Sequence, residues 1–486
     1  MPKSRRFDPG AGRPVCRLAG PRALRKFAHV ASLLALLPGL VTHAYADALT
    51  APQQLAKDIF KELVEINTVS DTGDTGRAAD AMAARLRAAG FGGRDIEVFK
   101  PAPRKGNLVA RLRGTGVRKP ILLLAHLDVV AANPADWSLD PFRFTEMDGY
   151  FYGRGASDDK DMAAALMTNL IRYKKEGYKP DRDIIVALTA DEEIGGGWGV
   201  AWLLKNHRNL IDAEFALNEG AGVTLKGGKA FRVNVQTAEK NTVNYRLEVA
   251  NRGGHSALPR PDNAIYRLAE GLTRLSKFSF PFNPGPTTRA FFARVADIES
   301  PRTAADIRSL LSGTPDPAAL LRVSANLAYN SQIHTTCVPT MLEGGHASNA
   351  LPQAARATIN CRIVPDESVE DVRAALVRVI ADDQISVSHP NQPTAGAPSA
   401  LSEGLLSVIE RTAAEFWPGA PVIQTMTTGS TDGRHLRKAG IPTYGHSGLA
   451  SDEARAHGKD ERVAAKSFFD STEYLYRLVK RLSEAK

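Results

Sequence analysis

The chain has 486 residues, of which 43% are hydrophobic and 24% charged, and its formal net charge is +9. This length exceeds the usual size of one hydrophobic core, so we expect two domains, and the composition excludes a fibrous or largely disordered protein. Residues 1–46 hold eight lysines and arginines against one aspartate, which leaves a charge of only +2 for the rest and excludes a basic surface for nucleic acid.

The basic N-terminal segment is typical of an export signal. An apolar run, Val30–Val41, follows the basic residues, and Ala44 and Ala46 match the small-x-small pattern that precedes signal cleavage. The run is shorter than the roughly 20 residues that cross a bilayer, so we expect no stable membrane anchor. We predict a signal peptide over residues 1–46 and a mature protein that is periplasmic or secreted. A buried helix of the fold is the alternative.

Helical and apolar strand patterns alternate over residues 47–237, which favours an α/β domain with a mostly parallel central sheet flanked by helices. Helical spacing covers Leu55–Ile66, Ala78–Ala89, Met162–Lys174 and Val200–Asn206. Strands are predicted at Asn107–Arg113, Ile121–Val130, Asp183–Glu193 and Glu214–Gly220.

The pattern changes over residues 238–393, where strands and helices follow a β-α-β-β-α-β order that indicates an inserted, ferredoxin-like α+β domain. The predicted strands are Asn241–Ala250, Ser331–Leu342, Ala354–Val364 and Ile385–Ser388, and the helices are Ala264–Leu275 and Val369–Ile380. The stretch Pro281–Leu321 receives no assignment. The α/β pattern returns over residues 394–486, with helices at Leu401–Phe416 and Arg462–Leu482.

Acidic and histidine side chains stand at or just beyond the ends of the predicted strands, where open α/β sheets place their sites. His126 and Asp128 lie two residues apart on one strand and so face the same way. Three consecutive carboxylates at 191–193 are costly to gather without a cation, although a solvated loop would also explain them. Asp158 and Asp159 fit metal ligands or a helix N-cap. These residues indicate a two-metal hydrolase.

Nine blocks in the chain resemble a known superfamily. In chain order they are LLAHLDVV, DGYFYGRGASDDK, TADEEIGG, NEG, GGHSALP, NALP, CRIVP, GSTDGRHLRKAGIP and AHGKDERV, and the resemblance covers nearly all of residues 52–482. The superfamily is that of the zinc metallopeptidases and includes aminoacylase, carboxypeptidase G, carboxypeptidase S, acetylornithine deacetylase and succinyl-diaminopimelate desuccinylase; the carboxypeptidase S-like branch is the most similar. The resemblance implies that the inserted domain is a lid and dimerisation domain. It also implies two zinc ions per chain, for which cobalt or manganese can substitute.

The resemblance also implies a role for individual residues. The metal ligands would be His126, Asp158, Glu193, Glu219 and His457, with Asp158 bridging the two ions and His446 as a rival to His457. Glu192 would be the general base, Asp128 would orient the His126 ring, and His255 would stabilise the oxyanion, often across a dimer interface. Arg362 and Asn349 would bind the substrate. The Asp158–Asp159 peptide is often cis in this superfamily. Asp161 is a departure, because glycine is usual there; an acid that opens a helix should be tolerated.

Cys337 and Cys361 fall on two strands that are predicted to form a hairpin. With the turn placed near residues 344–353, the two cysteines nearly oppose each other. In an oxidising compartment they would form a disulfide, and two free buried thiols are the alternative.

We therefore expect hydrolysis of an amide or peptide bond next to a free carboxylate, as in a carboxypeptidase or dipeptidase. An N-acyl-amino-acid deacylase is the alternative within the same chemistry, so the substrate is a small peptide or an N-acyl amino acid. A catalytically silent peptide-binding protein is a second class, but binding alone would not need Glu192. A serine hydrolase is not supported, because the chain has no Gly-x-Ser-x-Gly elbow.

Overall fold

The computed structural model describes residues 48–389, 396–453 and 455–484. The predicted signal peptide over residues 1–46 lies outside these residues. Judged by its internal contacts, Leu49–Lys486 forms one unit. Within the described ranges, no helix has both the length and the apolar character needed to cross a membrane.

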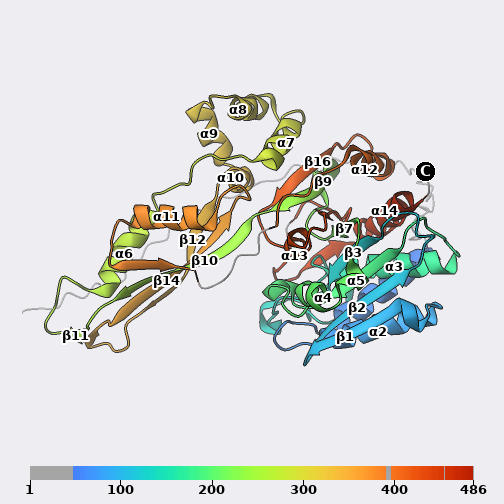
Figure 1. Cartoon of the computed structure of the whole chain (residues 1–486), viewed down its shortest axis with the longest axis horizontal. Coiled ribbons are helices and arrows are strands. Elements are labelled where there is room, and N and C mark those ends of the chain that lie inside the picture. Colours follow the sequence, from blue (N-terminus) through green and yellow to red (C-terminus); the bar gives the residue numbers. More distant parts are fainter. Residues whose placement is uncertain (1–47, 390–395, 454, 485–486) are drawn as a thin grey trace, which may run out of the picture. The chain divides into compact units, whose positions relative to one another are not determined.

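A ten-stranded mixed sheet confirms the predicted α/β architecture (Figure 1). Its order is β1-β2-β6-β3-β7-β17-β9-β8-β18, with β16 paired to β9, and the central strands β6, β3, β7 and β17 run parallel. Every residue of β3 and β6 is buried, as expected for a parallel sheet that is covered on both faces. The strands are β1 (Ile96–Ala102), β2 (Lys105–Leu112), β3 (Ile121–His126), β6 (Ile184–Thr189), β7 (Phe215–Asn218), β8 (Val223–Lys226), β9 (Lys229–Glu239), β16 (Val422–Thr427), β17 (Thr443–Gly445) and β18 (Ala450–Ser451).

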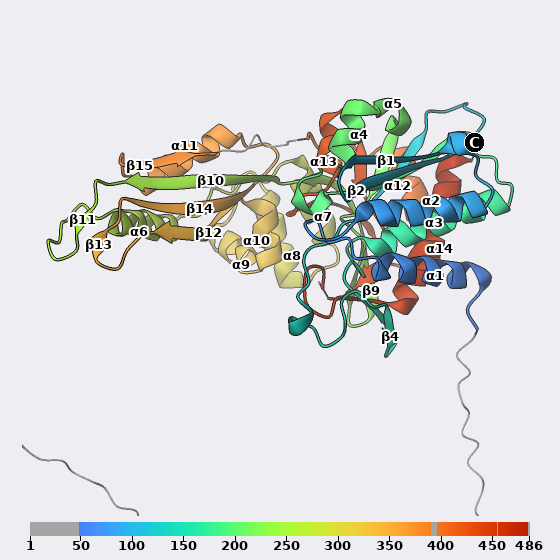
Figure 2. The same cartoon turned by 90° about the horizontal axis from the view of Figure 1, so that it is seen from below.

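Helices cover both faces of this sheet (Figure 2). Because successive strand residues point to opposite faces, Leu123 of β3 packs in one core with Phe60, whereas Leu122 packs in a second core with Leu203. The first core holds α1 (Ala51–Glu65), α2 (Thr75–Ala88), α3 (Lys160–Lys175), α12 (Glu403–Phe416) and α14 (Ala465–Ser483). The second core holds α4 (Val200–Asn206), α5 (Arg208–Ile211) and α13 (Gly433–Lys438).

The inserted region forms a separate four-stranded antiparallel sheet with the order β12-β14-β10-β15. Helices α6 and α11 share its core, so the ferredoxin-like order is confirmed. The elements are β10 (Asn241–Ala250), α6 (Ala264–Leu275), β12 (Thr336–Gly344), β14 (Ala354–Ile363), α11 (Val369–Ile380) and β15 (Ile385–Ser388). Cys337 and Cys361 lie directly opposite each other in the β12–β14 register and are joined by a disulfide.

The stretch that received no assignment is helical. It contains α7 (Pro286–Val295), α8 (Pro301–Leu311) and α9 (Pro317–Ser324), followed by α10 (Leu327–Ile333). Proline opens three of these helices, and the side chains of Ser300, Asp316 and Asn326 cap the last three. The predicted strand Ser331–Leu342 was therefore wrong at its start, because its first residues complete α10.

Short elements complete the fold. A three-stranded sheet contains β4 (Thr145–Met147), β5 (Tyr150–Tyr152) and β19 (Arg462–Ala464), and a two-stranded ladder contains β11 (Gly254–His255) and β13 (Ala350–Leu351). Turns of 3-10 helix occur at Gly93–Asp95, Pro134–Asp136 and Glu192–Ile194. The predicted helix Arg462–Leu482 thus begins with a strand. The domain boundaries near 237 and 393 stay predictions, and the second lies outside the described residues. Near residue 237 the chain passes from β9 of the large sheet to β10 of the small sheet.

Candidate active site

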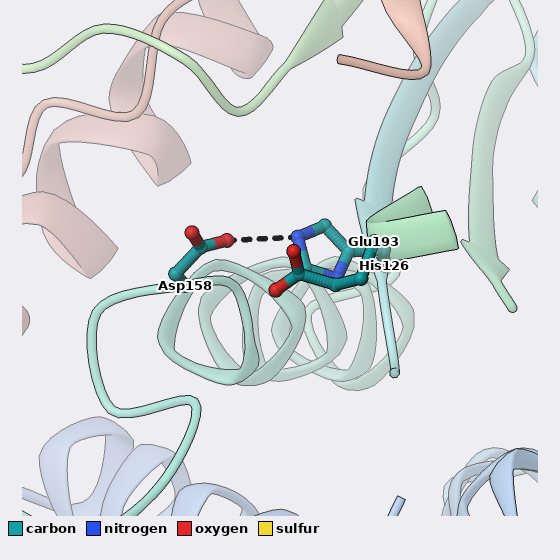
Figure 3. Close-up of side chains that lie close together, drawn as sticks. All are labelled: His126, Asp158 and Glu193. Carbon is teal, nitrogen blue, oxygen red and sulfur yellow. Dashed lines mark hydrogen bonds and ion pairs between the residues drawn. The ribbon is translucent and has the colours of Figure 1, made fainter. Parts of the chain in front are cut away.

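Two imidazoles and two carboxylates form a cluster at the carboxyl-terminal edge of the large sheet. His126 Nε2 lies 2.9 Å from Asp158 Oδ1, and ligand atoms of His126, Asp158 and Glu193 lie within 4.8 Å of one another (Figure 3). His457 Nε2 lies 3.2 Å from Asp158 Oδ2 and 3.1 Å from Glu193 Oε2. Imidazole nitrogen and carboxylate oxygen without thiolate are donors that suit zinc and related divalent ions.

The sheet topology brings half of the site together. His126 is the last residue of β3, Glu192 and Glu193 follow β6, and Glu219 follows β7. Because β6, β3 and β7 are parallel neighbours, their carboxyl ends meet at one edge of the sheet. The apolar runs in the sequence predicted these strands. They therefore also predicted that the polar residues at the strand ends lie at the same edge of the sheet.

Two loops that are far apart in the sequence bring in Asp158 and His457. Strand β5 lies just before the Asp158 loop, and β19 lies just after the His457 loop; the two strands pair antiparallel. The peptide between Asp158 and Asp159 is cis. In the first loop, Gly155 has a φ of +85°, and a Cβ there would lie 2.8 Å from Val129. This close packing explains the need for glycine at that position.

A buried ion pair that sequence reasoning missed ties these two loops. Arg154 Nη1 donates to Glu461 Oε2 at 2.6 Å, and the two side chains are 3% and 1% exposed. Glu461 also accepts hydrogen bonds from the main-chain N–H groups of Gly155 and Ser157, at 3.1 and 2.8 Å. Arg154 belongs to the glycine-rich block DGYFYGRGASDDK, and Glu461 belongs to the histidine-containing block AHGKDERV. The sequence shows a charged residue in each block, but it does not show that the two residues pair.

Asp128 contacts the His126 ring mainly through its main chain. The His126 Nδ1–H donates to the main-chain oxygen of Asp128 at 2.9 Å, whereas the Asp128 carboxylate lies 3.7 Å away. That carboxylate instead accepts the N–H groups of Glu192 and Glu193, at 3.1 and 3.2 Å, and the Ser70 hydroxyl at 2.9 Å. Asp128 thus fixes the ring through its main chain and the acidic turn through its side chain, and Nε2 of His126 is left facing the cluster.

The electrostatics of the site favour a bound cation. Burial raises the pKa of Glu192 well above its usual value, and the nearby Asp432 and Glu193 raise it further. Burial and the charges of Glu192 and Asp158 likewise raise the pKa of Glu219. Hydrogen bonds to Asp158 and Glu193 raise the pKa of His457 to about 10. Buried carboxylates at this density need positive charge beside them, which a divalent ion would supply, so the residues present fit a metal centre.

Glu192 is a buried acid of this turn with an unpartnered oxygen. The residue is 8% exposed, and its Oε1 atom has no hydrogen-bond partner among the described residues. The buried Asp191 also has an oxygen without a hydrogen bond, but that atom forms an ion pair with Lys105 at 2.5 Å. A buried carboxylate oxygen without a partner is costly unless it faces a ligand.

The rival histidine, His446, lies in the core. Its Nδ1–H donates to the main-chain oxygen of Asn234 at 2.8 Å, and Tyr474 donates its hydroxyl to Nε2 at 2.5 Å. Complete burial lowers the pKa of His446 to about 4. Both ring nitrogens are occupied by these partners, so His457 and not His446 belongs to the cluster.

The remaining predicted residues lie in the inserted domain, at opposite ends of its sheet. Arg362, near the end of β14, donates to Thr242 Oγ1 at 2.7 Å. His255 is exposed and pairs with Ala350 in the β11–β13 ladder, beside Asn349. This ladder adjoins the start of β14, eight residues from Arg362, which is about 26 Å of extended strand. One copy of this domain therefore does not bring His255 and Arg362 together.

With this geometry in place, the comparisons with known proteins decide the family. Residues 122–481 match the family described as Peptidase family M20/M25/M40. The chain belongs to this family. It is 30% identical to N-fatty-acyl-amino acid synthase/hydrolase PM20D1 of Xenopus tropicalis, over 74% of this chain and 72% of that protein. It is also 30% identical to Probable carboxypeptidase S-like 2 of Dictyostelium discoideum (74% and 71%) and 26% identical to Aminoacylase-1 of Sus scrofa (87% and 94%).

Solved structures agree on the fold. The M20 family metallo-carboxypeptidase Sso-CP2 from Sulfolobus solfataricus is 18% identical, with a TM-score of 0.63 over 87% of this chain and 98% of that one. The Bacillus subtilis YXEP protein, a dinuclear metal-binding peptidase from the M20 family, is 13% identical, with a TM-score of 0.52 over 89% and 99%. The M20 chain described here is a hydrolytic enzyme of the metallopeptidase and amidohydrolase kind.

Two further residues of this M20 enzyme lie near the cluster and were not singled out from the sequence. Asp432 is buried and accepts the Thr189 hydroxyl at 2.9 Å, and burial raises its pKa to about 7. Arg434 lies close enough to Arg362 to affect its ionisation. Burial lowers the pKa of Arg362, and the positive charge of Arg434 lowers that pKa further. Asp432 and Arg434 belong to the GSTDGRHLR block. The sequence shows that both residues are charged, but it does not show which side chains they contact.

Proposed function

We propose that this enzyme is an exported hydrolase with two metal ions that cleaves an amide or peptide bond next to a free carboxylate, as a carboxypeptidase or dipeptidase does. The observation that carries the proposal is the position of the buried, unpartnered Glu192 carboxylate next to the cluster of His126, Asp158, Glu193 and His457. The donor set fits zinc, with cobalt or manganese as substitutes.

The ligands divide into two sets that share one carboxylate. His126, Asp158 and Glu219 would hold one ion, and Asp158, Glu193 and His457 would hold the other. When bound, such a pair supplies Lewis-acid polarisation of the carbonyl and a lower pKa for water.

Glu192 acts as the general base and then as the general acid. Its carboxylate takes a proton from the attacking water and returns it to the leaving nitrogen. Burial raises the pKa of this carboxyl, which brings it closer to the neutral range where one group both accepts and releases a proton efficiently. Asp128 holds the turn that carries Glu192 through the Glu192 main-chain N–H.

Arg362 binds the carboxylate of the substrate. Its guanidinium is half-buried, it donates to Thr242 Oγ1 and Asn360 Oδ1, and Arg434 stands near enough to lower its pKa. The charge of Arg434 adds to the attraction for a carboxylate, which the Arg362 guanidinium can bind through two parallel N–H donors. This recognition is common to peptides with a free C-terminus and to N-acyl amino acids.

A homodimer through the inserted domain would complete the site. Arg362 and His255 lie at opposite ends of one domain, so the oxyanion-stabilising His255, with Asn349, would come from a second copy. The edge strand β12 exposes Val338, Met341 and Leu342, which are 54%, 60% and 69% exposed. An exposed apolar edge strand is a template for pairing with another chain. The inserted domain would then serve as both a lid and a dimerisation domain.

Export is supported by the basic leader with its apolar run and by the disulfide, which persists in oxidising compartments. The destination would be the periplasm or the exterior.

An N-acyl-amino-acid hydrolase is the second candidate. It is favoured by the 30% identity to the N-fatty-acyl-amino acid synthase/hydrolase and the 26% identity to Aminoacylase-1. A silent peptide-binding protein is disfavoured, because binding does not need a buried base.

The deciding experiment measures metal content by plasma mass spectrometry and amine release from dipeptides and N-acyl amino acids, with and without chelator. We expect about two metal ions per chain and release that the chelator abolishes. Glu192→Gln should keep the metal and lose turnover by at least about 100-fold. Near-normal turnover of this variant, or a chain that takes up no metal, would reject the proposal.

A further inference from the structure

A cavity of about 610 Å³ adjoins the ligand cluster. Asp158 and Glu219 line it on the cluster side, and apolar residues, Val223 and Leu449 among them, line its walls. Its volume lies within the usual range for small-molecule sites, about 300–1,000 Å³. Since Arg362 of the inserted domain takes the carboxylate of the substrate, the cavity is available for the acyl side of the scissile bond.

Asp161 is the unusual residue of this cavity. It lies in the first turn of α3, lines the cavity, and is 4% exposed. Its Oδ1 atom has no hydrogen-bond partner within the described ranges of the chain. Burial raises the pKa of Asp161 to about 8; the N–H of Met162 opposes this, and the charges of Asp158 and Glu461 add to it. The charged neighbours named here are thus acids, which do not stabilise a carboxylate at Asp161.

The cationic side chains around the cavity are already paired. Among the described residues that line it, the cations are Arg455 and Arg462. Both contact Glu453, at 2.6 and 3.2 Å, and Arg462 also lies 4.3 Å from the centre of the Tyr150 ring. Two buried cations nearby also have other partners: Arg154 is bound to Glu461, and Lys160 donates to the main-chain oxygen of Ile66 at 3.0 Å. None of these pairs gives Asp161 a counter-charge.

We propose that the cavity binds the acyl part of the substrate and that Asp161 recognises a positively charged nitrogen on it. The preferred substrates are then aminoacyl compounds, such as short peptides with a free amino group, and not N-fatty-acyl amino acids. This inference rests on the proposed function. The physical reason is that a neutral acyl chain would leave the Asp161 carboxyl unpaired in an enclosed site, whereas an ammonium group would satisfy it.

Matched substrates test this directly. The pair 4-aminobutyryl-leucine and pentanoyl-leucine differs only by an ammonium group in place of a methyl group, and glycyl-leucine with propionyl-leucine is the shorter pair. The value of kcat/KM is measured for the metal-loaded mature enzyme, for Asp161→Asn and for Glu403→Gln. Glu403 is an exposed acid in the first turn of α12, so its variant controls for the loss of a helix-terminal charge.

We expect the wild type to prefer at least one aminoacyl member over its isostere by at least about tenfold. Asp161→Asn should lose that preference through a lower kcat/KM for the aminoacyl substrate alone, and Glu403→Gln should keep it. A wild-type preference for the neutral members, or an equal effect of Asp161→Asn on both members, overturns the proposal even while hydrolysis itself stands. If Asp161→Asn does not fold, the wild-type preference decides. If neither pair is hydrolysed, the proposed function fails, and calorimetric binding of the same pairs to the wild type decides on Asp161.

Discussion

Removal of the Glu461 carboxylate should weaken the site without touching a metal ligand. Glu461 joins the loop that carries Asp158 to the loop that carries His457, through Arg154 and two main-chain N–H groups. In Glu461→Ala the Arg154 guanidinium keeps its charge but loses its 2.6 Å partner inside the protein.

The size of the effect follows from burial. An ion pair whose side chains are only 3% and 1% exposed leaves an uncompensated charge when one partner is removed, which costs about 3–5 kcal/mol. We expect a fall of this size in the free energy of unfolding. Looser loops should also reduce metal affinity by roughly 10- to 100-fold, as for other residues that support metal ligands.

The assay is urea unfolding of the metal-free protein together with a metal titration of the folded protein. Glu453→Ala is the matched control, because Glu453 also pairs with two arginines, Arg455 and Arg462, but is exposed. Its variant should lose less than about 1 kcal/mol and keep its metal affinity. If Glu461→Ala loses no more stability than Glu453→Ala and binds metal equally well, the argument for a loop clamp is refuted.

Three further outcomes are expected. Replacement of both Cys337 and Cys361 by serine should lower the free energy of unfolding by about 3 kcal/mol in urea, and thiol titration of the unreduced, denatured wild type should find neither cysteine free. The unfolded chain protonates His446 below about pH 6.5 but the folded chain only near pH 4, so stability should fall with decreasing pH between these values, and His446→Gln should lack this component. Met341→Glu with Leu342→Glu in β12 should give a monomer by light scattering, with metal retained and turnover lost; an active monomer would contradict the shared site.

The sequence by itself determined the core of the fold and half of the candidate site. Continuous apolar runs mark β3 and β6 as buried parallel strands, and the carboxyl ends of such strands meet at one edge. The strand pattern therefore predicted that His126 and the acids at 191–193 lie together, whereas Glu219 was singled out by the resemblance. The order of strands and helices in the inserted region likewise predicted its topology, because only a few arrangements satisfy that order.

Other features depended on residues that are distant in sequence. Periodicity gave no reason to choose His457 over His446, and the resemblance of the block AHGKDERV favoured His457. In the structure, the pairing of β5 with β19 brings the His457 loop to Asp158. The further partners of the Asp128 carboxylate could not be predicted for the same reason, because they are the N–H groups of a turn that lies 64 and 65 residues further along the chain.

Only the tertiary structure decided which charges lie buried and which ends of the inserted domain lie apart. In the sequence, Arg154 and Glu461 are two charged residues in separate motifs. Their buried ion pair forms only when the fold brings the two loops together. The separation of His255 from Arg362 follows from the register of β14 with its neighbours. Sequence patterns record which face of an element is apolar, whereas pairing between elements depends on the path of the whole chain.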